Sequence, residues 1–410
     1  MNILYIDHYA GSLRDGMEFR PYYLAREWIK EGHKVRVIGA DYSHLRTHQP
    51  DVPSDFCTEM IDGIEYQWVK AGSYEGNGAK RAITMFKFVW KLWSHAGKLA
   101  KDFKPDAVIT SSTYPLDSYA GNKIAKKAGC RYFHEAHDVW PLTLIELGGI
   151  SKHHPFVVVL DRAEKNAFKK ASKVISILPD PIEHMMEQGL GSKDKFIYIP
   201  NGIAKEDWDN AEPLPQEHKE CFDRLHAEGC KIVCFTGGIT KFDKLEFLLE
   251  AADKLKDDDK IRFVIVGKGM EKENFINQAK EMGLTNVTFL PPVSKKAVPS
   301  VLREADALYI VLPYCTLYRY GVSINKVYDY MMAGKPLIYG VEASNNEVAE
   351  ADCGITVDNR DVDSLVKAIR DLEDMPAEEL KRLGDNGQKW VLDNCEYKVL
   401  ANRFLEAIKN

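Results

Sequence analysis

Two short stretches contain residue types that can hold a proton or an anion. The first, FHEAHDVWP (133–141), follows an apolar run and contains Glu135, His137 and Asp138. A histidine on a loop at a strand end can act as a catalytic group near neutral pH. A neighbouring carboxylate would raise its pKa and orient its ring. We take all three residues as catalytic candidates. The alternative is a helix entry in which Asp138 is the cap and the Trp-Pro pair packs.

The second stretch, RYGVSINKVYDYMMAGKPLIYG (319–340), places glycine, serine, asparagine and lysine before a short helix. Helical spacing of apolar residues predicts that this helix starts near Asn325. Free N–H groups at a helix N-terminus bind anions such as phosphate, and Lys326 would add positive charge. Asp329, one turn later, could accept hydrogen bonds from ribose hydroxyls. The expected backbone donors are those of Gly321, Val322 and Ser323, and Ser323 is also the expected N-cap. The alternative is an ordinary capped helix.

Two glycine-containing turns follow predicted strands. FTGGITKFDK (235–244) and IVGKGMEKENF (265–275) each lead from a strand into a helix. A glycine-rich turn near cations suits a diphosphate, so we expect a contribution from both turns. The alternative is a plain strand–helix turn, and neither stretch is a Walker sequence. The candidate residues are Gly237, Gly238, Lys241, Lys244 and Gly267.

The loop after the first strand, YIDHYAGSLRDGMEFRP, offers two further cations. Arg14 and Arg20 are candidates for binding an anionic ligand or acceptor, and a solvated loop is the alternative. The loop is not a GxGxxG dinucleotide fingerprint. No DxD sequence stands where it would hold a metal, so we expect no metal cofactor.

The bulk composition is that of a globular protein of two domains. The chain has 410 residues, 45% hydrophobic and 28% charged, and a net charge of −6, which argues against a nucleic-acid binder. The cysteines show no CxxC spacing, which favours reduced thiols and a cytoplasmic protein. The N-terminus does not resemble a signal peptide, and no run of apolar residues is long enough to span a membrane.

Strand and helix patterns alternate along both halves of the chain. Predicted strands lie at 2–6, 35–39, 106–111, 130–135, 173–178 and 195–200, then at 231–236, 261–267, 286–290, 307–312, 336–340 and 354–357. This alternation predicts an α/β protein with two Rossmann-like, doubly wound domains facing across a cleft, with ligands at the carboxyl ends of the strands. We expect a first domain over 1–200, a polar linker over 201–228, a second domain over 229–392, and a C-terminal helix over 393–410 that can pack back on the first domain.

One predicted helical segment, 79–104, combines basic and aromatic side chains. Phe86, Phe88, Trp90 and Trp93 alternate with lysines, a composition that suits a peripheral helix on an anionic membrane surface. The alternative is a helix with its apolar face on the sheet and its lysines in water.

With these loops in view, the chain resembles the GT-B-fold retaining glycosyltransferases of the family 4 type over nearly its whole length. The resembling stretches are RPYYLAREWIKEGHKVRVIG, HDVWP, FIYIPNGI, FTGGITKFDKLEFLLEAADKL, FVIVGKGMEKENF and SINKVYDYMMAGKPLI. The resemblance implies that His137 lies near the sugar donor and that Asp329 binds the ribose of the nucleotide. It also shows a departure, because Gly321 stands where the family has its first acidic residue.

The resemblance implies transfer of a sugar from a UDP- or GDP-sugar to a hydroxyl of a lipid-linked or polysaccharide precursor. The first domain would bind the acceptor and the second the nucleotide sugar, without a metal, in the cytoplasm or on the inner face of the membrane. Two other functions stay open: a sugar-nucleotide epimerase of the same architecture, and a nucleotide-sugar-binding protein with a decayed site.

Overall fold

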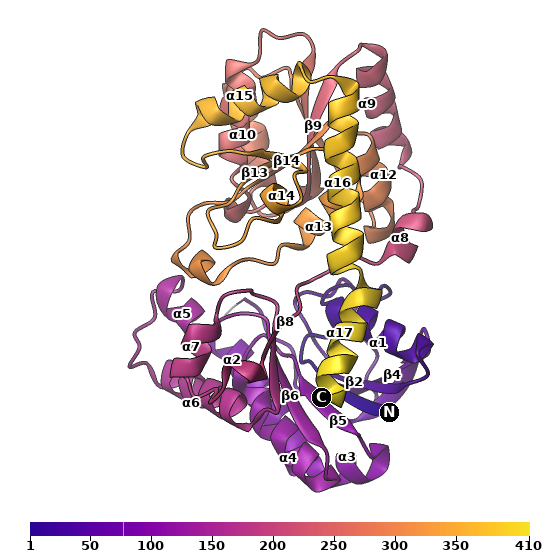
Figure 1. Cartoon of the computed structure of the whole chain (residues 1–410), viewed down its shortest axis with the longest axis vertical. Helices are drawn as coiled ribbons and strands as arrows, with labels where there is room; N and C mark the ends of the chain where they lie inside the picture. The colour runs from indigo at the N-terminus through magenta and orange to yellow at the C-terminus, as the bar shows by residue number, and fades with distance from the viewer. Residues whose placement is uncertain (77) are drawn as a thin grey trace. The chain divides into compact units, whose positions relative to one another are not determined.

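The computed structural model describes residues 1–76 and 78–410. They form two compact units, each built around its own sheet (Figure 1). The first unit comprises Met1–Asn201, Arg319–Ser323 and Tyr397–Asn410, and the second comprises Gly202–Tyr318 and Ile324–Glu396. The expected α/β architecture with two mainly parallel sheets is confirmed.

The sheet of the first unit runs in the order β3-β4-β2-β1-β5-β6-β7-β8, and only the β3–β4 pair is antiparallel among the described strands. Its strands are β1 (Asn2–Ile6), β2 (Lys34–Ala40), β3 (Cys57–Ile61), β4 (Ile64–Val69), β5 (Ala107–Thr110), β6 (Arg131–Ala136), β7 (Lys173–Ser176) and β8 (Phe196–Tyr198). Its helices are α1 (Arg20–Lys30), α2 (Ala79–Ser94), α3 (Ala96–Phe103), α4 (Ser118–Ala128), α5 (Leu142–Glu146), α6 (Pro155–Lys170), α7 (Ile182–Glu187) and α17 (Tyr397–Lys409).

The C-terminal helix α17 lies beside α1 in the first unit (Figure 1). The indole Nε1 of Trp28 on α1 donates to the carbonyl of Ala401 at 3.0 Å, and its ring meets Phe404 edge-on at 5.3 Å. Trp28 and Phe404 are both fully buried. The last helix of the chain therefore completes the core of the unit that contains the N-terminus.

The sheet of the second unit is parallel and runs in the order β11-β10-β9-β12-β13-β14. Its strands are β9 (Lys231–Gly238), β10 (Ile261–Lys268), β11 (Val287–Leu290), β12 (Ala307–Val311), β13 (Leu337–Gly340) and β14 (Gly354–Thr356). Its helices are α8 (Lys205–Asp209), α9 (Gln216–Ala227), α10 (Leu245–Lys254), α11 (Lys272–Glu281), α12 (Val298–Arg303), α13 (Asn325–Met332), α14 (Glu347–Glu350), α15 (Val362–Glu373) and α16 (Ala377–Cys395).

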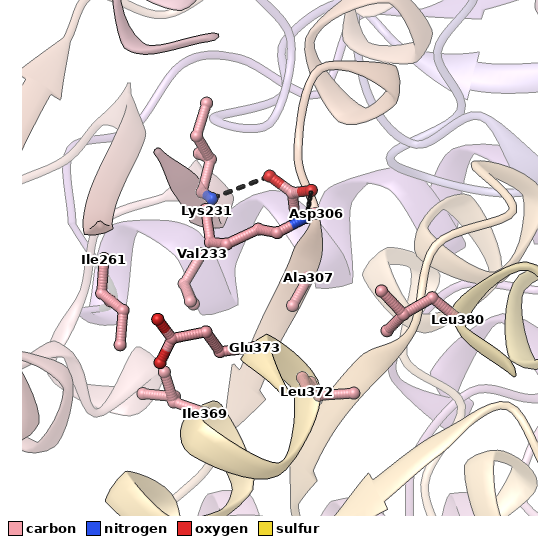
Figure 2. Close-up of a pocket in the computed structure, with 10 residues that line it drawn as sticks. Lys231, Val233, Ile261, Asp306, Ala307, Ile369, Leu372, Glu373 and Leu380 are labelled. Atoms are coloured by element: carbon pink, nitrogen blue, oxygen red, sulfur yellow. Dashed lines mark hydrogen bonds and ion pairs between the residues drawn. The ribbon is translucent and has the colours of Figure 1, made fainter. Parts of the chain in front are cut away.

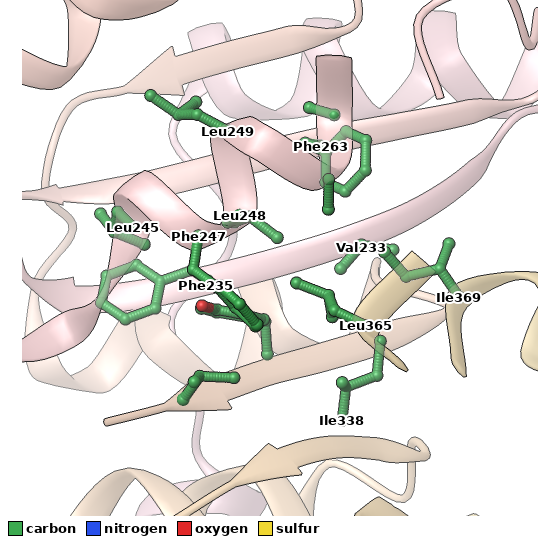
Figure 3. Close-up of a cluster of buried hydrophobic side chains, with 14 of the residues drawn as sticks. Val233, Phe235, Leu245, Phe247, Leu248, Leu249, Phe263, Ile338, Leu365 and Ile369 are labelled. Carbon is green, nitrogen blue, oxygen red and sulfur yellow. The ribbon is translucent and has the colours of Figure 1, made fainter. Parts of the chain in front are cut away.

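Apolar side chains on one face of this sheet form a core with the helices that cover it. Figure 3 shows Phe235 of β9 and Phe263 of β10 with Leu248 of α10 and Leu365 of α15, all of them buried. Both faces of a parallel sheet are covered by helices, so its strands read as continuous apolar runs in the sequence. The packing of these strands in the core fixes where each strand ends. The loops at their carboxyl ends therefore start from fixed positions.

The linker expected over 201–228 is not a linker in the structure. Helices α8 and α9 occupy most of it and belong to the second unit. Phe222 and Leu225 of α9 are buried, and His218 of the same helix contacts the carbonyl of Pro291 at 2.9 Å. The prolines that suggested a linker instead precede the helix, with Pro215 in the N-cap position.

Candidate active site

The carboxyl edge of the first sheet brings His137 next to two other polar side chains. Strands β5 and β6 are neighbours; Ser111 follows β5, and His137 follows β6, which contains Glu135. The Nε2 atom of His137 lies 2.7 Å from Oγ of Ser111 and 3.4 Å from Oε2 of Glu135. The expected histidine–carboxylate pair is therefore formed, with Ser111 as a member that the sequence did not indicate.

Glu135 is fully buried and cannot touch a substrate. Its Oε1 accepts hydrogen bonds from Nε and Nη2 of Arg20 at 2.9 and 2.8 Å, and its Oε2 accepts from Ser111 at 2.5 Å and from Tyr5. This corrects the expectation of a catalytic Glu135. It also corrects that of an anion-binding Arg20, which has no exposed side-chain surface and also donates to the carbonyls of Ile199 and Pro200.

The buried charges of this cluster stabilise one another. Burial would raise the pKa of Glu135, but the charge of Arg20 and the contact with His137 hold that pKa well below its ordinary value. Burial opposes a charge on His137 as well, yet the hydrogen bond and charge of Glu135 raise its pKa above the ordinary value. The pair is a carboxylate beside a ring that favours its protonated form.

Asp138 is hydrogen-bonded to the segment that leads into α5 but does not cap that helix, because Pro141 takes the N-cap position and no side chain caps it. Oδ1 of Asp138 accepts from the backbone N–H of Val139 and from Oγ1 of Thr143, both at 2.8 Å, at the entry to α5. Burial raises the pKa of this carboxyl group. These two hydrogen bonds hold the backbone directly after His137, and the catalytic role of Asp138 stays a prediction.

Arg14 is not a free cation either. Its Nε lies 2.7 Å from Asp15, and its two terminal nitrogens contact Glu59 at 2.9 and 3.0 Å. The two carboxylates raise the pKa of the guanidinium and neutralise its charge. The Arg14 side chain is 47% exposed, so an anion could replace these carboxylates, and the role of Arg14 in anion binding stays a prediction.

Two buried carboxyl groups near His137 were missed. Asp7 directly follows β1 and accepts from the N–H of Tyr9 at 2.9 Å, and Asp117 accepts from the N–H of Ser112 at 3.0 Å. Burial raises the pKa of Asp7 to about 7 and that of Asp117 to about 8. Asp7 could have been found by the rule that located His137, since both stand directly after a strand.

In the second unit, the turns after β9 and β10 lie against each other. The N–H of Ile239 donates to the carbonyl of Lys268 at 2.9 Å, and a Cβ on Gly267 would lie 2.0 Å from the carbonyl oxygen of Gly237. Glycine is therefore needed at 267 for close backbone packing, whatever binds nearby. Gly238, by contrast, is exposed, and a Cβ there would meet no atom within 4 Å.

Lys326 is the lysine that reaches this edge. A Cβ on Gly237 would come within 3.0 Å of its Cε, and its Nζ lies 4.4 Å from the ring centre of Phe235 and pairs with Asp243. Asn325 is the first residue of α13, and no side chain caps that helix. The start of α13 and the Lys326 ammonium therefore lie close to the end of β9, and their role in binding the donor stays a prediction.

The other two candidate lysines differ from Lys326. Lys244 donates from Nζ to the carbonyl of Asn359 and lies over the ring of Phe247 at 4.4 Å, so its ammonium already has partners within the second unit. Its assignment as a donor-binding residue stays a prediction. The Lys241 side chain is 80% exposed, and its nearest ion-pair partner, Glu271, lies 4.0 Å away.

Asp329 lies one turn into α13, and its carboxylate is already paired. Its Oδ2 lies 2.6 Å from Nζ of Lys295, which begins the 3₁₀ helix η4 (Lys295–Ala297). Lys295 was missed because it stands 34 residues away and no spacing links the two. The carboxylate remains 16% exposed.

The segment before α13 does not behave as expected. Ser323 does not cap the helix, since its Oγ accepts from the N–H of Asn201 at 2.8 Å and its carbonyl from the Asn201 side chain at 3.0 Å. The N-cap position is taken by Ile324. Gly321, Val322 and Ser323 belong to the first unit, which corrects their placement in the second domain.

Two family models match the chain in succession. The model described as a glycosyl transferase 4-like domain matches residues 15–202, and that described as glycosyl transferases group 1 matches residues 217–390. The chain belongs to the GT-B glycosyltransferases of the family 4 type. It is therefore a glycosyltransferase that uses a nucleotide-sugar donor, as the resemblance implied.

Individual relatives of this glycosyltransferase are distant in sequence. A putative colanic acid biosynthesis glycosyl transferase, WcaI, of Escherichia coli K12 is 25% identical over 297 residues, or 70% of each chain. Sucrose-phosphate synthase of Thermosynechococcus elongatus superposes with a TM-score of 0.69 at 16% identity, covering 100% of this chain and 98% of that one. HepE of Anabaena, solved in complex with UDP and glucose, gives 0.66 at 14% identity, covering 100% and 99%. These solved structures share the fold.

Residue 321 of the glycosyltransferase, where the resemblance led us to expect an acidic residue, is a glycine in a conformation that suits glycine. Gly321 has a φ of 87°, in the left-handed region that residues with side chains rarely adopt. An acidic residue at this position would strain the backbone that leads to Ser323. The local backbone of this chain therefore suits glycine at 321.

Two further observations bound the glycosyltransferase site. The pocket in Figure 2 is lined by Lys231, Ile261 and Ala307, which begin β9, β10 and β12, so it lies at the amino edge of the second sheet, opposite Lys326. Within residues 1–76 and 78–410, no group of three or more His, Cys, Asp or Glu side chains is arranged to hold a metal ion. Independence from metal stays a prediction.

Proposed function

We propose that this enzyme is a retaining glycosyltransferase that moves a sugar from a UDP- or GDP-sugar to a hydroxyl of a lipid-linked or polysaccharide precursor. The observation that carries the donor half is Lys326 beside the uncapped start of α13, with Asp329 one turn later. The name of the WcaI relative supports a polysaccharide precursor, and the UDP complex of HepE supports a nucleoside diphosphate.

The second unit would stabilise the leaving group of the reaction, the nucleoside diphosphate. As the glycosidic bond breaks, negative charge grows on the departing diphosphate. N–H groups and a cation fixed in place before the reaction lower the energy of that charge without reorganising. Lys326 and the first N–H groups of α13 supply these donors, Gly237 and Gly238 leave the backbone open, and Asp329 accepts from the ribose hydroxyls. A metal ion is not needed for this arrangement.

In the first unit His137 is the catalytic residue we propose. Glu135 acts only through it, because that carboxylate is buried. By the family resemblance His137 meets the sugar part of the donor. Replacing His137 with alanine should reduce acceptor glycosylation strongly while leaving nucleotide binding intact, since the nucleotide part is held by the second unit.

The test starts from binding and ends with the product. Calorimetry with UDP, GDP and a panel of their sugars identifies the donor. Turnover with extracted lipid-linked oligosaccharide then gives a product whose anomeric configuration is read by NMR. Retention of the donor configuration supports the proposal, and inversion overturns the retaining assignment. An epimerised nucleotide sugar formed without acceptor would instead identify an epimerase.

We also propose that α2 docks this enzyme on an anionic bilayer at the inner face of the membrane. Its outer side carries large apolar side chains at steps of three and four, Ile83, Phe86, Trp90 and Trp93, which are between 44 and 64% exposed. No Asp or Glu occurs from Gly78 to Lys101. In the part of the chain that the structure describes, no helix is long and apolar enough to cross a bilayer, so contact would be peripheral.

Lysines beside these side chains favour an anionic surface over a protein partner. Lys80 and Lys87 of α2 are exposed, and Nζ of Lys123 on the adjacent α4 lies 3.1 Å from the ring centre of Trp93. Each basic side chain near an anionic membrane contributes about 1 kcal/mol, and each large apolar side chain that inserts adds about 1.5–3 kcal/mol.

Sedimentation with vesicles tests the docking proposal. Full-length protein should bind phosphatidylglycerol vesicles and not phosphatidylcholine vesicles. Trp90→Ser should weaken binding about tenfold. The matched control is Phe242→Ser, which removes an aromatic side chain that is 66% exposed in the second unit and should change nothing. Equal loss in both variants, or binding that ignores lipid charge, would overturn the proposal.

A further inference from the structure

The hydrogen bonds around His137 form a chain in which every proton can be assigned. Ser111 has one hydroxyl proton, and the 2.5 Å contact assigns it to Oε2 of Glu135. The Ser111 oxygen can then only accept from His137, 2.7 Å away, so the ring must carry a proton on Nε2. The hydroxyl of Tyr5 donates to the same carboxylate oxygen, and Arg20 occupies the other one. The tautomer of His137 is therefore fixed by the fold.

The second nitrogen of the ring is left for a ligand. Among residues 1–76 and 78–410 none makes a hydrogen bond with Nδ1 of His137, although the side chain is only 9% exposed. An atom in this position either offers a lone pair, when the ring is neutral, or donates a hydrogen bond, when it is charged. The charges around the ring decide between these two states.

Charged and titratable groups face His137 from several elements. They are Glu135 and His134 on β6, Asp138 after it, Arg20 on α1, Glu18 before α1, Asp7 after β1 and Asp117 in the 3₁₀ helix η1 (Pro115–Asp117). Glu135 is ionised because the Arg20 guanidinium contacts it. The negative charges of Glu135 and Glu18 both favour the charged form of the His137 ring. The positive charge of Arg20 opposes a charge on the His137 ring. The effect of Glu135, which contacts both side chains, is larger, since the pKa of His137 is raised. Asp7 and Asp117 add little charge below pH 7.

We propose that Arg20, Glu135 and Ser111 are positioning residues that hold His137 as an imidazolium with Nε2 directed inward and Nδ1–H presented to the donor substrate. His137 then acts as a cationic hydrogen-bond donor, not as a general base. No proton is transferred to or from it in the reaction. The inference rests on the proposed function only for the identity of the group that Nδ1–H meets, which is an oxygen of the sugar or of the departing diphosphate.

The sign of the pH dependence follows from this state. The raised pKa means that the charged ring, and with it activity, is present below that pKa and is lost as the pH rises through it. A general base would show the opposite dependence, with activity lost on the acid side. Replacing Glu135 by glutamine removes the charge that favours the imidazolium, so the alkaline loss of activity should move to lower pH.

The test uses NMR of the ¹⁵N-labelled full-length protein, which needs no substrate. Long-range proton–nitrogen spectra distinguish the two tautomers and follow the pKa, and His137→Gln identifies the signals. In the unaltered protein we expect Nε2–H in the neutral ring and a pKa above the ordinary value. Glu135→Gln should lower that pKa by about one unit or more. The matched control is Glu164→Gln, another buried glutamate that contacts a different histidine, His184, at 3.1 Å; it should leave His137 unchanged.

A second pair of variants keeps the test valid if Glu135→Gln does not fold. Ser111→Ala removes the nearer acceptor of Nε2–H without touching a charge, leaves Glu135 Oε2 at 3.4 Å, and should weaken the preference of the neutral ring for the Nε2–H tautomer. Ser111→Thr keeps the hydroxyl and should restore that preference. A neutral ring with its proton on Nδ1, or equal shifts in the Glu135 and Glu164 variants, would overturn the inference. These spectra are recorded without donor or acceptor. They can therefore contradict the inference about His137 while the proposed transfer reaction is confirmed, and they can support the inference while the transfer reaction is contradicted.

Discussion

Replacing Lys326 with methionine tests which lysine of the second unit meets the diphosphate. Lys326 lies against Gly237 at the end of β9, and its side chain is 28% exposed. A hydrogen bond from a cation to a phosphate contributes about 1.5–3 kcal/mol, which predicts a loss of UDP or GDP affinity of about tenfold to a hundredfold. The lower end is expected, because Lys326 must loosen its contact with Asp243 to bind the ligand.

The substitution also has a stability cost that the assay must separate. Asp243 loses the partner of Oδ1, while its Oδ2 keeps the hydrogen bonds from the N–H and the hydroxyl of Thr240 at 3.0 and 2.6 Å. We expect a loss of about 1–2 kcal/mol in the free energy of unfolding, which lowers the Tm by a few degrees in a domain of this size. Affinity is therefore measured by calorimetry well below the Tm of the variant.

Lys241→Met is the matched control. Lys241 stands in the same loop region but is mostly exposed, and an exposed ion pair at 4.0 Å contributes little. Its affinity should change less than about twofold. Asp243→Asn should strengthen binding, because the Lys326 charge is then no longer neutralised. If Lys241→Met weakened binding as much as Lys326→Met, or if Lys326→Met changed nothing, the assignment of Lys326 would be wrong.

Three further outcomes are expected. Gly269→Ala would place a Cβ 1.9 Å from the carbonyl oxygen of Ile239. It should lower the free energy of unfolding, measured by urea denaturation, by about 1–3 kcal/mol. Gly97→Ala, on an open helix surface, should not lower the free energy of unfolding. Treatment with EDTA should leave turnover unchanged. Asp7→Asn should stabilise the protein at pH 8 but much less at pH 5 in thermal unfolding. The buried carboxyl, with a pKa of about 7, is already neutral at the lower pH, so stability falls as the pH rises towards that value. Equal stabilisation at both pH values would contradict this.

Most strands of the two sheets were predictable from sequence. Both faces of a parallel sheet are buried, so its strands are continuous apolar runs. The hairpin β3–β4 at the end of the first sheet was missed because both of its strands mix polar and apolar residues and contain no continuous apolar run. A signal was present nevertheless: Asp62 and Gly63 join the two strands, and both have positive φ, of 49° and 82°. An Asp-Gly pair between alternating runs is a strong hairpin signal. Attention to apolar runs alone hides it.

The position of the site was predictable, but the pairing of its charges was not. The rule that ligands meet the carboxyl ends of strands located His137 from sequence, and the rule that helix N-termini bind anions located Lys326. The first of these rules also proposed Arg20, yet Arg20 pairs with a carboxylate 115 residues away. Sequence shows where cations stand relative to strand ends, whereas their partners come from other strands and helices. Which cation remains accessible is therefore a tertiary property.

That property bears on how this enzyme would bind its donor. Two lysines of the second unit are paired with carboxylates in the structure: Lys326 with Asp243 and Lys295 with Asp329. Donor binding is then an exchange of partners, and its free energy is the difference between two ion pairs. Only a side chain with exposed surface can make this exchange. Lys326 and Lys295 are 28 and 37% exposed, whereas the buried Arg20 cannot leave Glu135. Affinity for the diphosphate should accordingly depend on the two exposed lysines, and the buried arginine should affect rate through His137.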